Sequence, residues 1–259
     1  MNANKLKFAL SLLSIFFVNT CLAQEVVVQA DYSTQRAYDA TYCFGGYGLE
    51  GDDEDYKAND SMASKYDESA DAGNDGACLT STLDATKSTI PNDTSYDYVG
   101  WATGSGLHLK EAFKDADLSK YSISFDAKIS GTDTLSSSKC FLEFVVPDDA
   151  VAKDEDDNAD VVLGLERGQA DGTDTFAITN EYQTFSFNLK DEMNTTKGTV
   201  EDLAKHEVKM ISLMVQAQGM IWDIGRDGDN VLYVDNIRLV KKAEEVEKES
   251  EKEAEKTSD

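Results

Sequence analysis

The chain has 259 residues, with 50 Asp and Glu against 24 Lys and Arg, so its formal net charge at pH 7 is -26. This charge repels nucleic acids and anionic membrane surfaces and argues against both as partners, whereas calcium and neutral sugars remain compatible ligands. With only two His residues, a three-His zinc site is excluded and a His-based catalytic triad has no further support.

Residues 1–23 have the three parts of an export signal. Lys5 and Lys7 precede an apolar run over 8–18, and the segment ends in Cys-Leu-Ala, a small-residue cleavage site. The apolar run is too short to cross a membrane. We therefore expect cleavage, no membrane insertion afterwards and a secreted (periplasmic or extracellular) chain. Lipoprotein anchoring through Cys21 is the less favoured alternative.

Three cysteines would remain after cleavage, namely Cys43, Cys78 and Cys140. An oxidising compartment permits a disulfide, but the odd count leaves one thiol over. Cys140 alternates in phase with apolar residues, so we expect it to be a buried small side chain. The pairing of Cys43 with Cys78 and the absence of any disulfide remain equal alternatives.

The rest of the chain is typical of many short strands separated by polar turns. Alternation is clearest over 121–129, where the odd-numbered residues are apolar or aromatic and all even-numbered ones are polar. Strands are expected at 26–28, 76–84, 96–102, 121–129, 140–146, 161–165, 184–189, 211–218 and 231–239. Helical turns are expected only at 110–116 and 200–205. This pattern predicts one all-β, antiparallel sandwich domain over 24–240, followed by a charged low-complexity tail over 241–259.

The last expected strand contains an unusual acid. After a polar turn, Val231, Tyr233, Asp235, Ile237 and Leu239 are expected to share one face of the strand. Asp235 would then lie in a largely apolar row, where an isolated buried carboxylate costs several kcal/mol. It would need a cation, a basic side chain or a cluster of backbone donors.

This ending, Tyr-Val-Asp-Asn-Ile-Arg-Leu after a Gly-Asp-Asn turn, resembles the last strand of galactose-binding-like jelly-roll modules. Many of these are carbohydrate-binding modules of secreted bacterial enzymes. The stretches 98–106, 117–128 and 181–189 resemble earlier elements of such modules in the same order. The resemblance covers roughly 76–240, and it implies a galactose-binding-like jelly-roll β-sandwich that binds a polysaccharide or oligosaccharide without catalysis.

The same resemblance implies a structural calcium ion (Ca2+). In the related modules the Asp corresponding to Asp235 often helps to hold calcium, and an early acid completes the site. Here Glu50, Asp52 and Asp53 are the candidates for that acid. Calcium takes six to eight oxygen ligands, which carboxylates can supply. The alternative for Asp235 is a pair with a Lys or a turn cap.

Sugar binding combines an aromatic ring, which packs on the apolar face of a pyranose, with polar side chains for the hydroxyls. Candidate residues of both kinds are Tyr98, Trp101, Tyr182, Gln216, Gln218, Trp222 and Arg226. Glu143 alternates out of phase with its apolar neighbours and is a further candidate for this surface. The alternative for the tryptophans is the core, and for the polar residues it is an ordinary solvated strand face.

Two other functions stay open. One is a jelly-roll glycoside hydrolase or polysaccharide lyase, although no pair of carboxylates stands out by its spacing. The other is a cell-surface structural protein without a small ligand. The sequence favours the non-catalytic binding protein and does not predict an oligomeric state.

Overall fold

The computed structural model describes residues 24–30, 41–45, 62–67, 78–84, 98–146, 160–168, 173–220, 224 and 228–242. For 41–45 and 62–67, and for Asp84, Tyr98, Val99, Asp160 and Met220, it describes the backbone alone. Residues Gln24–Lys242 form one compact unit. The expected export signal and nearly all of the expected tail lie outside the described residues.

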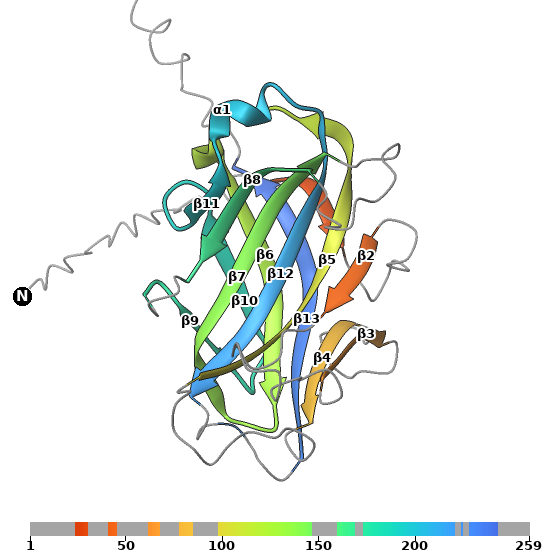
Figure 1. The fold of residues 1–259 in the computed structure, drawn as a ribbon, viewed down its shortest axis with the longest axis vertical. Helices are drawn as coiled ribbons and strands as arrows, with labels where there is room; N and C mark the ends of the chain where they lie inside the picture. The colour runs from red at the N-terminus through yellow and green to blue at the C-terminus, as the bar shows by residue number, and fades with distance from the viewer. Residues whose placement is uncertain are drawn as a thin grey trace, which may run out of the picture. The chain divides into compact units, whose positions relative to one another are not determined.

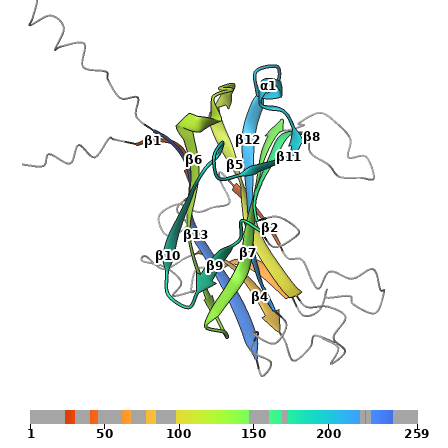
Figure 2. The ribbon, with the colours of Figure 1, turned by 90° about the vertical axis from the view of Figure 1, so that its left-hand side faces the viewer.

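The unit consists of two antiparallel sheets that lie face to face, as Figure 2 shows edge-on. The six-stranded sheet has the order β10 (Gln183–Asn188), β6 (Tyr121–Ser130), β13 (Asp229–Lys241), β4 (Cys78–Asp84) and β3 (Met62–Asp67), and β1 (Glu25–Ala30) also pairs with β13. The seven-stranded sheet has the order β11 (Asn194–Gly198), β8 (Asp160–Arg167), β7 (Thr134–Val146), β12 (Val208–Met220), β5 (Tyr98–Phe113) and β2 (Thr41–Gly45), and β9 (Phe176–Thr179) also pairs with β7. The expected all-β sandwich is therefore confirmed.

The core lies between the sheets and is built by the predicted alternation. Ile123, Phe125 and Ile129 of β6 are buried on one side, opposite Leu142 and Phe144 on the inner face of β7. Cys140 is buried in the same row as Leu142, as expected. Cys78 is also buried, but the side chain of Cys43 is not described, so a Cys43–Cys78 disulfide and the absence of any disulfide both stay alternatives.

Helical structure is short in the described part of the chain. Residues Leu118–Lys120 form the 3-10 turn η4, and Val200–Leu203 form α1 within the expected helical turn. The helical turn expected at 110–116 is wrong, because β5 continues as a strand to Phe113, which pairs with Val208 of β12. Tertiary pairing thus overrides the local preference. No helix among the described residues is long and apolar enough to cross a membrane.

Strand β13 contains a bulge that turns its side chains over. Its register with β6 shifts between Asp235, which faces Asp126, and Arg238, which faces Ser124, and Asn236 has a left-handed φ of 50°. One extra residue in a strand moves every later side chain to the opposite face. The expectation that five alternate residues share one face is therefore wrong. Val231, Tyr233 and Asp235 lie on the outer face, whereas Ile237 and Leu239 pack into the core.

Candidate functional site

The outer face of the seven-stranded sheet carries a mixed set of side chains on β7 and β12, the two strands that cross the front of Figure 1. Met214 faces Phe141, and Gln216 faces Lys139, in the register of these strands. Residues directly opposite one another in antiparallel strands project from the same side of a sheet. We call the set on this side the β7–β12 face; its members are Lys139, Phe141, Glu143, Met214, Gln216 and Gln218.

Two neutral amides lie together on the β7–β12 face. Gln216 and Gln218 are both half-buried, and the Nε2 of Gln216 donates a hydrogen bond to the Oε1 of Gln218 at 3.4 Å. The Gln216 amide lies over the backbone of Gly100, where a Cβ would come within 2.7 Å of its Nε2. An amide carries two donors and one acceptor oxygen, so each keeps hydrogen-bonding capacity for a ligand. Both residues lie on the outer face, as the alternation predicted.

Phe141 is the aromatic side chain of this face, and sequence reasoning missed it. It is half-buried and lies between Met214 of β12 and Glu166 of β8 in the sheet register. The neighbouring Cys140 and Leu142 are core residues, so an aromatic residue between them has to point outward. That signal, an aromatic residue out of phase with a buried row, was present in the sequence.

Glu143 supplies an acid next to Phe141 along the outer face of β7. Neighbouring groups withdraw its carboxylate from water although the residue remains exposed, and this desolvation raises the pKa above the ordinary 4.5. The positive charge of Lys197 acts in the opposite direction. Desolvation disfavours the charged form of a carboxyl group, which explains the direction of the pKa shift.

The other predicted sugar-binding residues do not gather here. Trp101 is 0% exposed and faces Ala217 inside the core, so its ring is not an exposed platform, and its Nε1 has no hydrogen-bond acceptor among the described residues. The backbone of Tyr98 lies in β5, but its side chain is not described. Trp222 and Arg226 lie outside the described residues.

Tyr182 directly precedes β10 of the opposite sheet and lies near a buried acidic pair. Asp126 of β6 and Asp235 of β13 face each other in register and are 7% and 1% exposed. The Oγ1 of Thr184 and the Nδ2 of Asn236 donate to the two oxygens of Asp126 at 2.6 and 2.9 Å. The backbone N–H of Asn236 donates to Asp235 at 2.7 Å. Asp235 is thus buried, as expected, but on a polar face instead of in an apolar row.

A lysine and two tyrosines adjoin this acidic pair. The ammonium of Lys128 lies 5.3 Å from the ring centroid of Tyr182 and 5.0 Å from that of Tyr233, which is the geometry of cation–π contacts. Desolvation raises the pKa of Tyr182, and nearby negative charge, including that of Asp235, adds to the effect. Its hydroxyl is buried without a hydrogen-bond partner among the described residues.

The acidic pair is the part of the chain that bears on the expected calcium site. Asp126 and Asp235 bring two carboxylates together, which fits the oxygen ligands that calcium prefers. The described residues contain no group of three or more His, Cys, Asp or Glu that could hold a metal ion. Glu50, Asp52 and Asp53 lie outside the described residues, so the early acid stays a prediction.

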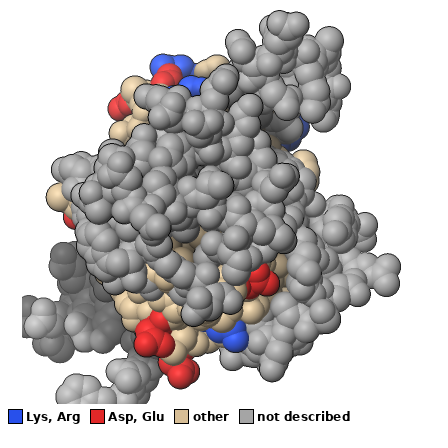
Figure 3. Space-filling model, turned by 60° about the horizontal axis from the view of Figure 1, so that its bottom comes forward, with Lys and Arg blue, Asp and Glu red and all other residues tan. Residues whose placement is uncertain are grey.

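Charged side chains are scattered over the described surface that Figure 3 presents. Near the top of the view blue Lys and Arg groups lie against red Asp or Glu groups, and near the bottom both kinds lie among other residues. The described residues of this face therefore present no concentrated positive charge.

No protein-family model and no curated protein matches this chain. Among solved structures, it is similar to a family 11 carbohydrate-binding module from Clostridium thermocellum in complex with a β-1,3-1,4-mixed-linked tetrasaccharide, with 13% identity, a TM-score of 0.41 and coverage of 85% of this chain and 98% of that chain. It is also similar to TmCBM27, a mannan-recognising carbohydrate-binding module, with 10% identity, a TM-score of 0.35 and coverage of 85% and 99%. An exo-β-agarase has 11% identity and a TM-score of 0.34, with coverage of 82% of this chain and 24% of that chain. Carbohydrate-binding modules are thus among the solved structures that the chain resembles.

Proposed function

We propose that the protein binds a neutral polysaccharide or oligosaccharide without catalysis, on the β7–β12 face. The observation that carries this proposal is the half-buried ring of Phe141 on the same side of the sheet as the paired amides of Gln216 and Gln218. An aromatic ring packs on the C–H face of a pyranose, and amides bind hydroxyls as both donors and acceptors. An uncharged glycan is not repelled by the acidic surface.

The expected export signal supports this proposal from a different direction. The export signal expected at residues 1–23 would deliver the protein to a compartment where polysaccharides are available. Export itself stays a prediction, which N-terminal sequencing of the protein recovered from culture medium, periplasm and membranes would test.

Calorimetric titration with a panel of soluble neutral glycans tests the binding proposal. Replacing Phe141 by Ala removes the ring, and replacing Gln216 by Ala removes an amide, so we expect each change to weaken the glycan affinity about tenfold. Lys190→Ala, an exposed change outside the β7–β12 face, is the matched control and should bind as the wild type does. Melting temperatures of all variants verify that they remain folded.

Two results would overturn the proposal. One is the absence of binding by the wild type to every glycan of the panel. The other is release of new reducing ends from a bound glycan, abolished by Glu143→Gln, because it would replace simple binding by hydrolysis.

We also propose that a structural calcium ion binds at Asp235, with Asp126 as a second ligand. Like charges directly opposite each other across two strands are destabilising, and a divalent cation would compensate both. The hydrogen bonds that Asp126 already accepts from Thr184 and Asn236 hold its carboxylate in place. The expected role of the ion is to stabilise the fold and not to contact the glycan.

Thermal unfolding with calcium and with a chelator tests this site. At about a hundred times its dissociation constant, calcium should stabilise the wild type by about 2.7 kcal/mol. Asp235→Asn keeps an oxygen that can accept from Asn236 but removes the charge, so this variant should gain nothing from calcium.

Asp191→Asn makes the same change of charge at an exposed position and serves as the control. It should keep the full calcium gain. A calcium gain of equal size in Asp235→Asn would place the ion elsewhere and remove this proposal.

A further inference from the structure

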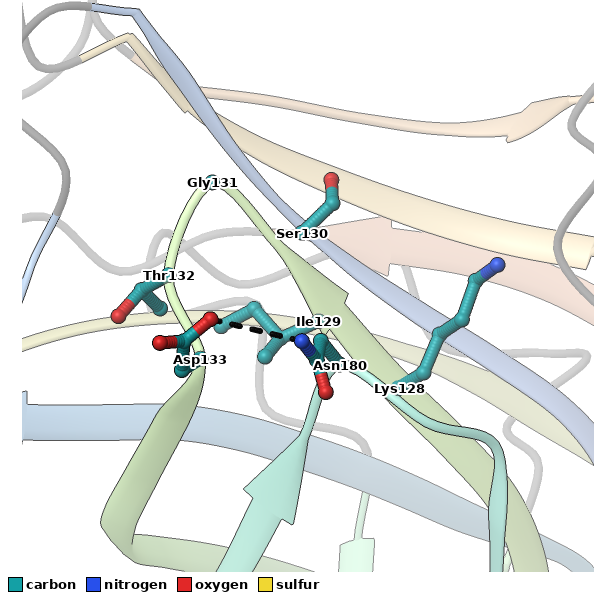
Figure 4. Close-up of a pocket in the computed structure, with 7 residues that line it drawn as sticks. All are labelled: Lys128, Ile129, Ser130, Gly131, Thr132, Asp133 and Asn180. Atoms are coloured by element: carbon teal, nitrogen blue, oxygen red, sulfur yellow. Dashed lines mark hydrogen bonds between the residues drawn. The ribbon is translucent and has the colours of Figure 1, made fainter.

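A pocket of about 290 Å³ lies where β6 turns toward β7, shown in Figure 4. It opens because β10 leaves β6 at this point: their pairing ends at Gln183 and Ala127, and the chain before Gln183 meets the β6–β7 turn instead. Its lining residues are Lys128, Ile129, Ser130, Gly131, Thr132, Asp133 and Asn180. The pocket is separate from the β7–β12 face and shares no residue with it.

Backbone and side-chain contacts hold the walls of the pocket in place. The N–H of Asn180 donates to the carbonyl of Asp133 at 3.1 Å, and the Nδ2 of Asn180 donates to the Oδ1 of Asp133 at 3.4 Å, as Figure 4 shows. Gly131 has a φ of 89° and packs so closely on Asp229 that a Cβ would overlap its carbonyl oxygen. The turn is therefore fixed against β13, and a ligand would meet a largely preformed site.

The lining offers a hydrogen-bond acceptor and a hydrogen-bond donor that could bind the hydroxyls of a ligand. Asp133 and Asn180 are exposed at the mouth of the pocket, and they present a carboxylate and an amide that is already oriented by its bond to the acid. The hydroxyl of Ser130 points away from these two groups and lies 3.3 Å from the hydroxyl of Tyr233. A carboxylate accepts hydrogen bonds, and an amide both donates and accepts them. Two neighbouring hydroxyls of one ligand can therefore each find a partner here.

Charge and size narrow the ligand further. Asp133 is the charged side chain beside Asn180, whereas the ammonium of Lys128 lies over the rings of Tyr182 and Tyr233, so the pocket disfavours an anion. The volume lies at the small end of ligand pockets, which span roughly 300–1,000 Å³. A compact, neutral, hydroxyl-rich molecule fits both limits.

We propose that this pocket is a second carbohydrate site, which binds one neutral sugar unit through Asp133 and Asn180. The ligand class is taken from the proposed function, whereas the location and the size of the ligand follow from the pocket. A chain end or a free monosaccharide would occupy it, while the β7–β12 face would bind the interior of a chain.

Amide chemical-shift titration of the full chain with methyl glycosides of glucose, mannose, galactose and xylose tests this proposal. At least one glycoside should produce saturable shifts centred on 128–133 and 180. Asp133→Ala and Asn180→Ala should each weaken that binding about tenfold, because each removes hydrogen bonds to the sugar. Phe141→Ala should leave it unchanged. Glu181→Gln, an exposed change next to Asn180 but outside the lining, is the control and should also leave it unchanged.

The two proposals fail in different ways. Polysaccharide binding without saturable glycoside shifts at the pocket would overturn the second site and leave the β7–β12 face standing. Glycoside shifts at the pocket without any binding at the β7–β12 face would overturn binding by that face and leave the pocket site standing. Shifts at 128–133 and 180 produced by calcium chloride alone would contradict a sugar pocket and assign the site to a cation.

Discussion

A residue belongs to the β7–β12 face when its side chain points away from the core. Gln216 and Gln218 follow simply from alternation with Val215 and Ala217, so their place on the outer face could be predicted. The outward direction of Phe141 obeys the same rule, although in the sequence the apolar residues on either side of it are the more obvious pattern. Alternation does not say whether an aromatic residue such as Trp101 points inward, because β5 lacks a clean apolar row around it.

The desolvation of Glu143 has a consequence for stability against pH. Its pKa is higher in the folded protein than in the unfolded chain, so the folded protein holds this proton more tightly. The wild type therefore loses stability as the pH rises from the ordinary value of 4.5 through the folded pKa. Gln carries no charge, and Glu143→Gln should melt above the wild type at pH 7.

Paired melting curves at pH 7 and well below pH 4.5 measure this effect. The two proteins should melt at nearly the same temperature in acid, because Glu143 is then protonated in both states. A difference that is the same at both pH values would show that Glu143 acts through packing and not through its charge.

At the scale of the element, β13 shows where the alternation of apolar and polar residues fails to predict the direction of side chains. Each half of the strand alternates as predicted, but the bulge at Asn236 puts the two halves in opposite phase. Periodicity cannot locate a single inserted residue. Asn is one of the few residues that tolerate a left-handed backbone, so the Asp-Asn pair was the available hint. The burial of Asp235 could be predicted from its sequence context, but its facing partner Asp126 could not.

Two substitutions of Asn236 separate the contributions of its hydrogen bond and of its left-handed backbone to the stability of the fold. Asn236→Gly keeps the left-handed backbone accessible but loses the hydrogen bond to Asp126, which should cost about 1–3 kcal/mol. Asn236→Ala loses the same bond and adds the strain of a left-handed Ala, about 1 kcal/mol more. Free energies of unfolding from urea titrations measure both. Equal stability of the two variants would mean that the left-handed backbone at 236 is not retained in solution.

For the molecule as a whole, the two-sheet architecture could be predicted, because many short alternating strands and few helical segments have few other solutions. The order of the strands could not, since pairings such as that of β9 with β7 join segments far apart in sequence. The candidate face depends on these pairings. It joins Phe141 to Gln216 only because β7 and β12 are neighbours, although more than 60 residues of sequence separate them.

That neighbour relationship is also the feature on which the proposed function depends most. A soluble glycan that binds by calorimetry can be titrated into isotope-labelled protein while the backbone amide shifts are recorded. We expect the saturable shifts to fall on both strands together, over 139–143 of β7 and 214–218 of β12. Saturable shifts that spare both segments, or that appear on the six-stranded sheet alone, would contradict glycan binding by this face.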